Sequence, residues 1–338
     1  MNSPSHSLSL LLISPQTYNY HEIIIGACQE LGVNCTWLDE RPFSNSFFKL
    51  FARLSNRLAR RLSAVIYLNR LKSLHSRGLS PTHVLIIKGE ALHSSVIEYM
   101  RCAFPRARFI LYFWDSVAKL PGHKSIIPYF DIVASFDYRD CTSYGWVYCP
   151  LFSGNAGADH LVRSSTSFER LPLYDWSFVG VVHSDRIQVL DKLLRHTAGS
   201  LSHYLYLYFP SYMHLCLYFL RCPAAFCRIF SYIHLAPLPP VEMSRIYWDS
   251  RCVLDIHHPC QAGLTMRTIE SIVSGVKLAS TNKWISREPI YDPSRVLILD
   301  RSSPNISPSF LAATSLHIPD SVAEYYHPRQ WMHRLLHL

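Results

Sequence analysis

Glycine is absent from the segment in which a dinucleotide-binding fold would place its phosphate-binding loop. The first predicted strand, Leu8–Ser14, is followed by "PQTYNYHE", which contains no glycine. A dinucleotide cofactor requires a GxGxxG loop at this point, because glycine allows the backbone to approach the pyrophosphate closely. The sequence therefore predicts that no such cofactor is bound, and it argues against a dehydrogenase or an epimerase.

Paired cysteines and a secretion signal are also missing. The ten cysteines are scattered and contain no CxxC pair, so their spacing does not suit a zinc site. The first residues, "MNSPSHSLSLLLISPQ", have neither the basic start nor the long apolar run of a signal peptide. We therefore expect free thiols in a reducing compartment and a cytoplasmic location.

Charged residues are few, and they are mainly of one sign. They make up 17% of the chain, and 33 lysines and arginines outnumber 24 acidic residues, which gives a formal net charge of +9. Such a balance favours acidic partners, including nucleotides and anionic lipid. Nucleic acid is not expected as a partner, because the basic residues cluster in one helix and no known binding module is present.

The stretch Leu201–Leu220 contains no Asp, Glu, Lys or Arg and is long enough to span a bilayer. Pro210 and Ser211 divide it, however, and the preceding "YLYLYF" is typical of a strand. We predict a strand followed by a surface helix. A membrane span is the alternative.

The stretch Ser46–Lys72 contains no acidic residue and is typical of a basic amphipathic helix. Its apolar residues recur at helical spacing, and basic residues lie largely elsewhere: Lys49, Arg53, Arg57, Arg60 and Arg61. Such a helix can lie on an anionic leaflet, so we expect peripheral attachment to the inner face of the plasma membrane. The alternative is a core-facing helix whose arginines are solvated.

Strands and helices alternate through the chain. Apolar strands are predicted at Leu8–Ser14, Val33–Leu38, Thr82–Gly89, Ala107–Asp115 and Phe130–Asp137. The pattern restarts after a polar stretch at residues 153–172, and the last residues look helical. This alternation predicts an α/β fold with parallel sheets. We assign an N-terminal domain at residues 1–165, a second domain at residues 173–318, and a terminal helix at residues 319–338.

Charged residues follow several of the predicted strands: Lys88, Glu90, Asp115 and Asp137. Ligands of parallel α/β sheets bind beyond the carboxyl ends of the strands. The sequence therefore predicts a functional site at this edge of the first sheet.

The segment "LTMRTIESIVSGVKLAST" predicts a loop, a helix and a buried strand. Thr265 is a plausible N-cap, Met266–Val273 keeps helical spacing, and Gly275 is a typical helix stop. A helix N-terminus suits an anion such as a diphosphate, and Arg267 in the first turn would strengthen its field. The alternative is an ordinary surface pair between Arg267 and Glu270.

Four stretches resemble glycosyltransferases of the GT-B type, in particular bacterial enzymes of lipopolysaccharide, capsule or exopolysaccharide assembly. They are "IYWDSRCVLDIHHPCQAGLTMRTIESIVSGVKLASTN", "LYFWDS", "SFDYRD" and "DWSFVGVVHSDR". The resemblance implies two Rossmann-like domains facing a cleft. The second would hold a nucleotide-sugar donor, the first would face a saccharide or lipid-linked acceptor, and the terminal helix would cross back to the first. It also implies that neither a metal nor a further cofactor is needed.

The resemblance assigns Glu270 to the ribose hydroxyls of the donor, because a carboxylate can accept from both at once. The family often has a second glutamate eight positions earlier, where this chain has Ala262; the neighbouring Gln261 could substitute as a neutral donor and acceptor. The other residues that we assign to donor binding are Gly180, Gly263, Thr265, Arg267 and Thr268.

An inverting transfer also needs a base to accept the proton of the acceptor hydroxyl. Asp115, Asp137 and Glu90 are the candidates, and desolvation after an apolar strand could raise the pKa of Asp115. A helix N-cap is an equally plausible role for Asp115. Lys88 would either neutralise the leaving phosphate or cap the sheet. The alternative function is a catalytically silent sugar- or lipid-binding component of a polysaccharide assembly complex.

Overall fold

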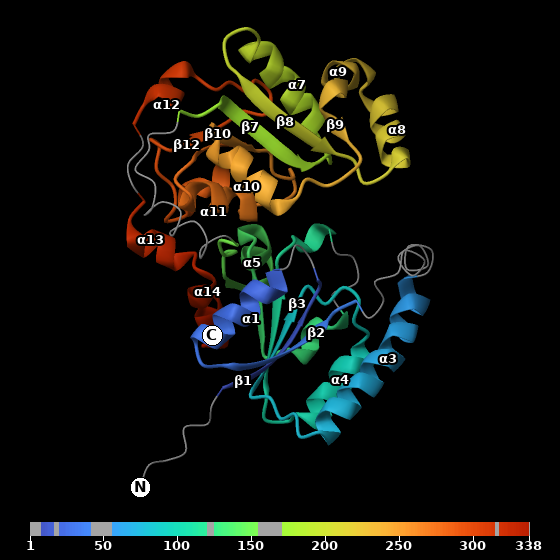
Figure 1. The fold of residues 1–338 in the computed structure, drawn as a ribbon. Helices are drawn as coiled ribbons and strands as arrows, with labels where there is room; N and C mark the ends of the chain where they lie inside the picture. Colours follow the sequence, from blue (N-terminus) through green and yellow to red (C-terminus); the bar gives the residue numbers. More distant parts are fainter. Residues whose placement is uncertain are drawn as a thin grey trace. The chain divides into compact units, whose positions relative to one another are not determined.

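The computed structural model describes residues 8–16, 20–41, 56–119, 125–154, 171–314 and 318–337, and the side chains of residues 56–62 are not described. The chain forms two compact units, each built on its own sheet (Figure 1). Unit 1 comprises Met1–Gly154 and Tyr326–Leu338, and unit 2 comprises Asn155–Tyr325.

Unit 1 contains a six-stranded parallel sheet in the order β2-β1-β3-β4-β5-β6. Its strands are β1 (Ser9–Ser14), β2 (Asn34–Asp39), β3 (His83–Ile87), β4 (Arg108–Phe113), β5 (Ile132–Ser135) and β6 (Val147–Tyr148). Most residues of β1, β3 and β4 are fully buried, as expected for a parallel sheet covered on both faces. The five strands predicted in this region are therefore confirmed, with small differences at their ends.

The helices of unit 1 are α1 (Tyr20–Glu30), α3 (Asn56–Ser76), α4 (Ser94–Ala103), α5 (Tyr138–Tyr144) and α14 (Pro328–Leu336), with short 3-10 turns η1 (Val117–Lys119) and η3 (Ile127–Tyr129). In α3, Ala64, Tyr67 and Leu71 are buried in the core, whereas Val65 is exposed. The basic part of the predicted amphipathic helix, including Arg53, Arg57, Arg60 and Arg61, lies outside the side chains that are described.

The helix α14 packs on unit 1, although it follows all of unit 2 in the sequence. Its Trp331 ring lies 5.1 Å from the Tyr112 ring and 4.8 Å from the Phe152 ring, measured between centroids. Pro328 begins the helix, and the side chain of His327 accepts a hydrogen bond from the Arg329 N–H as its N-cap. The amphipathic face of this helix is therefore buried against the first sheet and α1.

Unit 2 contains a second six-stranded parallel sheet, in the order β12-β11-β10-β7-β8-β9. Its strands are β7 (Tyr174–Val181), β8 (His203–Tyr208), β9 (Ile233–His234), β10 (Ser250–Asp255), β11 (Lys277–Ser280) and β12 (Val296–Ile298). Its helices are α7 (Arg186–Thr197), α8 (Tyr212–Arg221), α9 (Pro223–Ile229), α10 (Pro240–Trp248), α11 (Met266–Val273), α12 (Pro308–Ala312) and α13 (Asp320–Tyr325), with 3-10 turns η4 (Phe230–Tyr232) and η5 (Lys283–Arg287).

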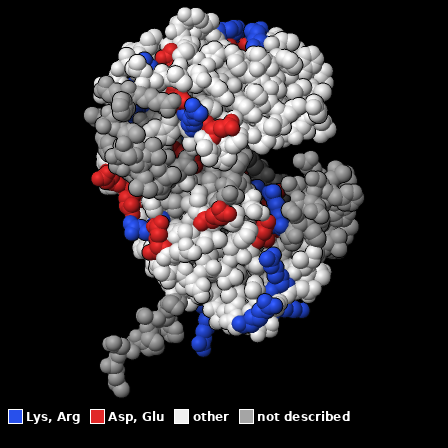
Figure 2. Space-filling model, viewed as in Figure 1, with Lys and Arg blue, Asp and Glu red and all other residues white. Residues whose placement is uncertain are grey.

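The uncharged stretch Leu201–Leu220 forms the strand β8 and then the helix α8. Ser211 separates them as an N-cap, because its hydroxyl accepts a hydrogen bond from the His214 N–H at 3.2 Å. Among the residues that the structure describes, no helix has the length and apolar character needed to cross a membrane. The predicted strand and surface helix are thus confirmed, and the surface over α8 shows a broad area without charged residues (Figure 2).

Candidate functional site

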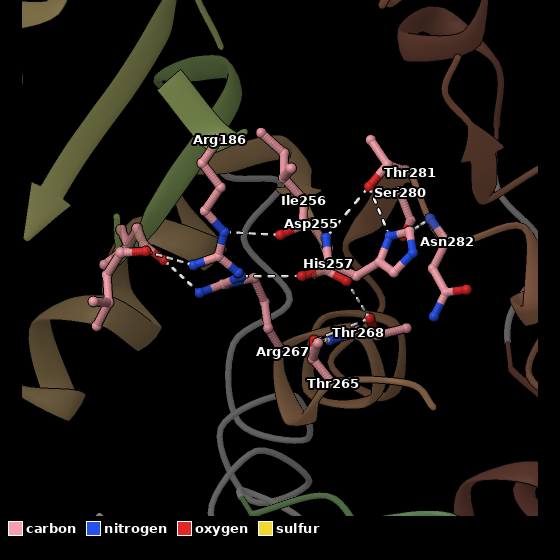
Figure 3. Close-up of polar contacts among 12 residues, drawn as sticks. Arg186, Asp255, Ile256, His257, Thr265, Arg267, Thr268, Ser280, Thr281 and Asn282 are labelled. Carbon is pink, nitrogen blue, oxygen red and sulfur yellow. Dashed lines mark hydrogen bonds and ion pairs between the residues drawn. The ribbon is translucent and has the colours of Figure 1, made fainter. Parts of the chain in front are cut away.

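The strand β10 ends at Asp255, which is fully buried at the carboxyl edge of the second sheet. One carboxylate oxygen accepts from the Arg267 guanidinium at 3.0 Å, and the other accepts from the Thr268 hydroxyl at 2.8 Å (Figure 3). Burial alone would raise the pKa of Asp255, but the Arg267 charge and the Thr268 hydrogen bond outweigh it and hold this pKa below its ordinary value. Asp255 is therefore an anion at neutral pH.

The Arg267 side chain connects three elements of unit 2. Besides Asp255, its guanidinium donates to the Tyr247 hydroxyl of α10 at 3.0 Å and to the Val179 carbonyl of β7 at 2.7 Å. Three of the five guanidinium N–H groups of Arg267 donate to the protein in this way, and its predicted contact with a diphosphate stays a prediction. The alternative of a surface pair with Glu270 is wrong, because both residues are largely buried.

A second buried arginine, Arg186, lies beside Arg267. It begins α7 and donates to the Ile256 carbonyl at 2.8 Å and to the Val181 carbonyl at 2.6 Å. Burial, together with the positive charge of Arg267, lowers the pKa of Arg186 to about 9. The sequence analysis missed this residue, although its position in a first helical turn after a strand is the same signal that marked Arg267.

Gly180 of β7 has a steric role next to the two arginines. A Cβ atom at this position would lie 2.8 Å from the Arg267 Nη2 and 3.4 Å from the Arg186 Nη1. Both guanidinium groups also lie over the ring of Phe178, at 5.2 Å for Arg267 and 5.4 Å for Arg186. The lack of a side chain at Gly180 therefore provides the space that the two guanidinium groups occupy.

The loop before α11 is fixed by buried hydrogen bonds. The Gly263 carbonyl accepts from the Gln261 side-chain amide and from the Asn282 side-chain amide, each at 3.2 Å. Thr265 caps α11 by accepting from the Thr268 N–H at 3.2 Å, as predicted. The side chain of Thr268 is fully buried and its hydroxyl donates to Asp255, and the assignment of Thr268 to donor binding stays a prediction.

A long-range ion pair closes the same edge of the sheet. The Arg301 guanidinium donates to both oxygens of Asp185, at 2.6 and 2.7 Å, and also donates to the His257 carbonyl. His257 in turn contacts the Thr281 hydroxyl at 2.8 Å. Sequence reasoning missed the Asp185–Arg301 pair because its members lie 116 positions apart.

Glu270 lies in the second turn of α11. It follows Arg267 and Thr268, the two residues of this helix that contact Asp255. Only 6% of its surface is exposed. Burial is the largest cause that raises the pKa of Tyr247, and the negative charge of Glu270 adds to it. The charge of Glu270 therefore acts on the Tyr247 hydroxyl that accepts from Arg267.

At the corresponding edge of unit 1, Lys88 brings two of the predicted carboxylates together. Its Nζ lies 3.2 Å from a Glu90 oxygen and 3.3 Å from an Asp115 oxygen. Burial alone would lower the pKa of Lys88, but the two carboxylates outweigh it and raise this pKa. Lys88 has a φ of +74°, which is uncommon for a residue other than glycine and marks a constrained turn after β3.

Asp137, the third predicted base, has a different environment. It is fully buried and caps α5 by accepting from the Arg139 N–H at 2.9 Å. This geometry favours a capping role over the predicted proton-accepting role, because a carboxylate without exposed surface does not reach an acceptor. Asp115, in contrast, does not cap the next helical turn. The N–H of Val117, the first residue of η1, donates to Asp140 at 2.8 Å instead.

Glu40 is a buried carboxyl that the sequence analysis missed. It follows β2 at the edge where Lys88 follows β3, and none of its surface is exposed. The Ala91 N–H donates to one of its oxygens at 2.7 Å, whereas the other oxygen has no hydrogen-bond partner among the described residues. Burial raises the pKa of Glu40 to about 7. Its position shortly after a predicted strand was the sequence signal that could have identified Glu40 as a candidate site residue.

The raised pKa of Glu40 predicts a pH-dependent stability. The folded protein keeps a proton that the unfolded chain releases near pH 4.5, so this contribution to stability is lost as the pH rises through about 7. Relative to a Glu40→Gln variant, the unfolding free energy of the wild type should fall by about 2–3 kcal/mol between about pH 5 and pH 8. Urea unfolding at both pH values measures this difference.

The matched control for Glu40 is Glu30→Gln, because Glu30 is an exposed glutamate at the end of α1. The unfolding free energy of this control should equal that of the wild type at both pH values. If the unfolding free energy of Glu40→Gln changes with pH as that of the wild type does, Glu40 is ionised in the folded protein throughout this range.

Potential metal ligands do not gather in the part of the chain that is described. No group of three or more His, Cys, Asp or Glu residues is arranged there to hold a metal ion. The rings of His183 and His258 lie 5.6 Å apart, but among the described residues no third His, Cys, Asp or Glu completes a metal-binding group with them.

Comparison with known proteins gives structural matches only. No protein-family model matches the sequence, and no curated protein matches it. Anabaena HepE in complex with UDP and glucose has 6% sequence identity and a TM-score of 0.59, and the match covers 98% of each chain. An alpha-glucosyltransferase in complex with UDP and a mismatched 13-mer DNA has 13% identity and a TM-score of 0.55, covering 98% of this chain and 95% of that chain.

A third match is the catalytic domain of starch synthase IV from Arabidopsis thaliana, bound to ADP and acarbose. It has 9% identity and a TM-score of 0.54, and the match covers 97% of this chain and 94% of that chain. These similarities extend over nearly the whole length of both chains. The protein therefore has the GT-B fold with two parallel α/β sheets, which confirms the predicted fold class.

Proposed function

We propose that this protein is a glycosyltransferase that moves a sugar from a nucleotide-sugar donor to a saccharide or lipid-linked saccharide acceptor. The observation that carries the proposal is the positively charged carboxyl edge of unit 2, where three arginines face two aspartates. These residues are Arg186, Arg267, Arg301, Asp185 and Asp255. The solved structures of similar fold that hold UDP or ADP support the same class of ligand.

The donor diphosphate would bind at the N-terminus of α11. The first N–H groups of a helix have no partner within it, so they can donate to an anion. Arg186 and Arg267 would support this site by their charge from within the protein. Glu270, in the next turn, would accept hydrogen bonds from the ribose hydroxyls.

The acceptor would bind at the edge of unit 1 that contains Lys88. Asp115 is the proposed base: its carboxylate takes the hydroxyl proton as the new glycosidic bond forms and the nucleoside diphosphate leaves. The ammonium of Lys88 lies 3.3 Å from an oxygen of this carboxylate and would hold it in position. Glu90 contacts the same ammonium and is the second candidate.

The proposed setting is the assembly of cell-surface polysaccharide at the cytoplasmic face of the membrane, without a metal or a further cofactor. Incubation with a panel of nucleotide-sugars tests the proposal, because the true donor stabilises the protein thermally. Slow release of the nucleotide from that donor would identify an enzyme. Binding without any release would identify a catalytically silent component of an assembly complex.

A Glu270→Ala variant tests the donor site directly. If Glu270 accepts from the ribose hydroxyls, the change should weaken nucleotide binding by about 1.5–3 kcal/mol, as for hydrogen bonds to a charged group. Isothermal titration with the donor nucleotide measures this loss. Glu242→Ala is the matched control, since it removes an exposed glutamate from α10 of the same unit. Equal affinities of the two variants would remove Glu270 from the site.

A further inference from the structure

The helix α8 exposes a row of large apolar side chains. This α8 face consists of Tyr212, Met213, Leu217, Phe219 and Leu220. Met213 and Leu220 are 70% and 75% exposed, whereas Tyr218 on the opposite side of the helix is buried in the core of unit 2. Residues three and four positions apart lie on one side of a helix, so Met213, Leu217 and Leu220 form one stripe. The helix is therefore apolar on two sides, of which one packs in the core and the other is exposed to solvent.

Exposed apolar side chains continue beyond α8 in the sequence. Phe230, Leu235 and Val241 are also exposed, although each is large and apolar. In Figure 2 the surface of unit 2 over α8 and α9 is white over a broad area, so it carries few visible charges. Contiguous exposed apolar surface on a folded protein is typical of a site that contacts another molecule or a membrane.

The sequence on both sides of α8 is free of acidic residues over a long stretch. No Asp or Glu occurs between Asp191 and Glu242, whereas this stretch contains Lys192, Arg195, Arg221 and Arg228. Asp191 itself is buried, and both of its oxygens accept from the Arg228 guanidinium, at 2.5 and 2.8 Å. Arg221 is exposed at the C-terminal end of α8. A surface that combines exposed apolar side chains with an exposed arginine at one end complements an anionic lipid interface.

Other occupants of this surface agree less well with the charge pattern. A rim of mixed polar and charged groups is ordinary for protein–protein interfaces, so such an interface gives no reason to exclude every acidic residue from the segment. A membrane span is excluded for α8, because the helix has only 10 residues. An amphipathic helix that lies in the plane of the interface has no such length requirement.

We propose that the α8 face docks on an anionic membrane, with the helix axis parallel to the bilayer surface. Met213, Leu217 and Leu220 enter the boundary between headgroups and acyl chains, and Tyr212 lies at headgroup level, where tyrosine is enriched. Arg221 contacts lipid phosphates. This surface belongs to unit 2 and is formed by other residues than the stretch 46–72, for which the sequence suggested membrane contact. The proposal does not depend on the transferase function.

Flotation of the full chain with vesicles tests the proposal, using phosphatidylcholine with or without phosphatidylglycerol, at low and high salt. Binding should require phosphatidylglycerol and weaken with salt. A Leu217→Glu/Leu220→Glu variant should bind at least about tenfold more weakly, because it places two charges in the interface. An Arg221→Gln variant should bind about fivefold more weakly at low salt. Leu217 and Leu220 are exposed, so an unchanged unfolding midpoint should accompany the loss.

The matched control is Leu171→Glu/Leu173→Glu, which adds the same charge at two exposed leucines outside α8. This control should bind vesicles as the wild type does. The proposal is overturned if the α8 variant binds equally well, or if a variant with Arg53, Arg57, Arg60 and Arg61 changed to glutamine alone loses binding. It is also overturned if the wild type binds no vesicles and is a dimer in solution, whereas the α8 variant is a monomer. Nucleotide affinity, measured in parallel, should be the same in all variants.

Discussion

Replacing Asp255 by alanine should lower the unfolding free energy of the protein by about 3–5 kcal/mol, the usual cost of removing one partner from a buried ion pair. The Arg267 guanidinium would remain among Tyr247, Val179 and Phe178 without its counter-ion, and the Thr268 hydroxyl would lose its acceptor. Urea unfolding followed by tryptophan fluorescence measures the loss, since Trp176 lies in the core of unit 2.

An Asp131→Ala variant is the control for Asp255, because Asp131 pairs with Arg101 at 2.8 Å and both side chains are partly exposed. Its loss of stability should be less than half as large, since solvent screens the remaining charge. A double variant, Asp255→Ala/Arg267→Ala, should lose less stability than the sum of the two single variants, because it leaves no unpaired charge. Similar losses for Asp255→Ala and Asp131→Ala would contradict the buried network.

Replacing Asp115 by asparagine should slow transfer by about 10²- to 10⁴-fold and leave the affinity for the donor unchanged. The change removes the proton acceptor with little change in volume, and a positioned base contributes about this factor. Asp115 keeps about a third of its side chain exposed and lies 3.3 Å from the Lys88 ammonium, so asparagine loses the ion pair without a buried cavity. Rates at saturating donor and acceptor, with donor affinity from titration, measure both quantities.

Two further carboxylates provide the controls for Asp115. Glu90→Gln disturbs the same Lys88 cluster and should reduce the rate far less. Asp137→Asn weakens the N-cap of α5, so it should lower stability by about 1 kcal/mol and keep the rate per folded molecule. Near-normal turnover of Asp115→Asn together with an inactive Glu90→Gln would move the role of the base to Glu90.

The sequence alone determined the local elements of the fold. Apolar runs located the strands of unit 1, and helical spacing with Thr265 before it and Gly275 after it located α11. These patterns are local, because a cap, a glycine with positive φ and an apolar face act within a few residues. For the same reason the divided stretch Leu201–Leu220 was correctly predicted as a strand and a helix.

Only the tertiary structure decided which charged residues are buried and what they contact. Arg267 was marked by its place in a first helical turn, but its counter-ion Asp255 lies 12 positions away on another element, and Arg301 finds Asp185 across 116 positions. The raised pKa of Glu40 likewise depends on complete burial rather than on neighbours in sequence. Pairing and desolvation arise when strand ends from distant parts of the chain meet at one sheet edge, and no local pattern encodes them.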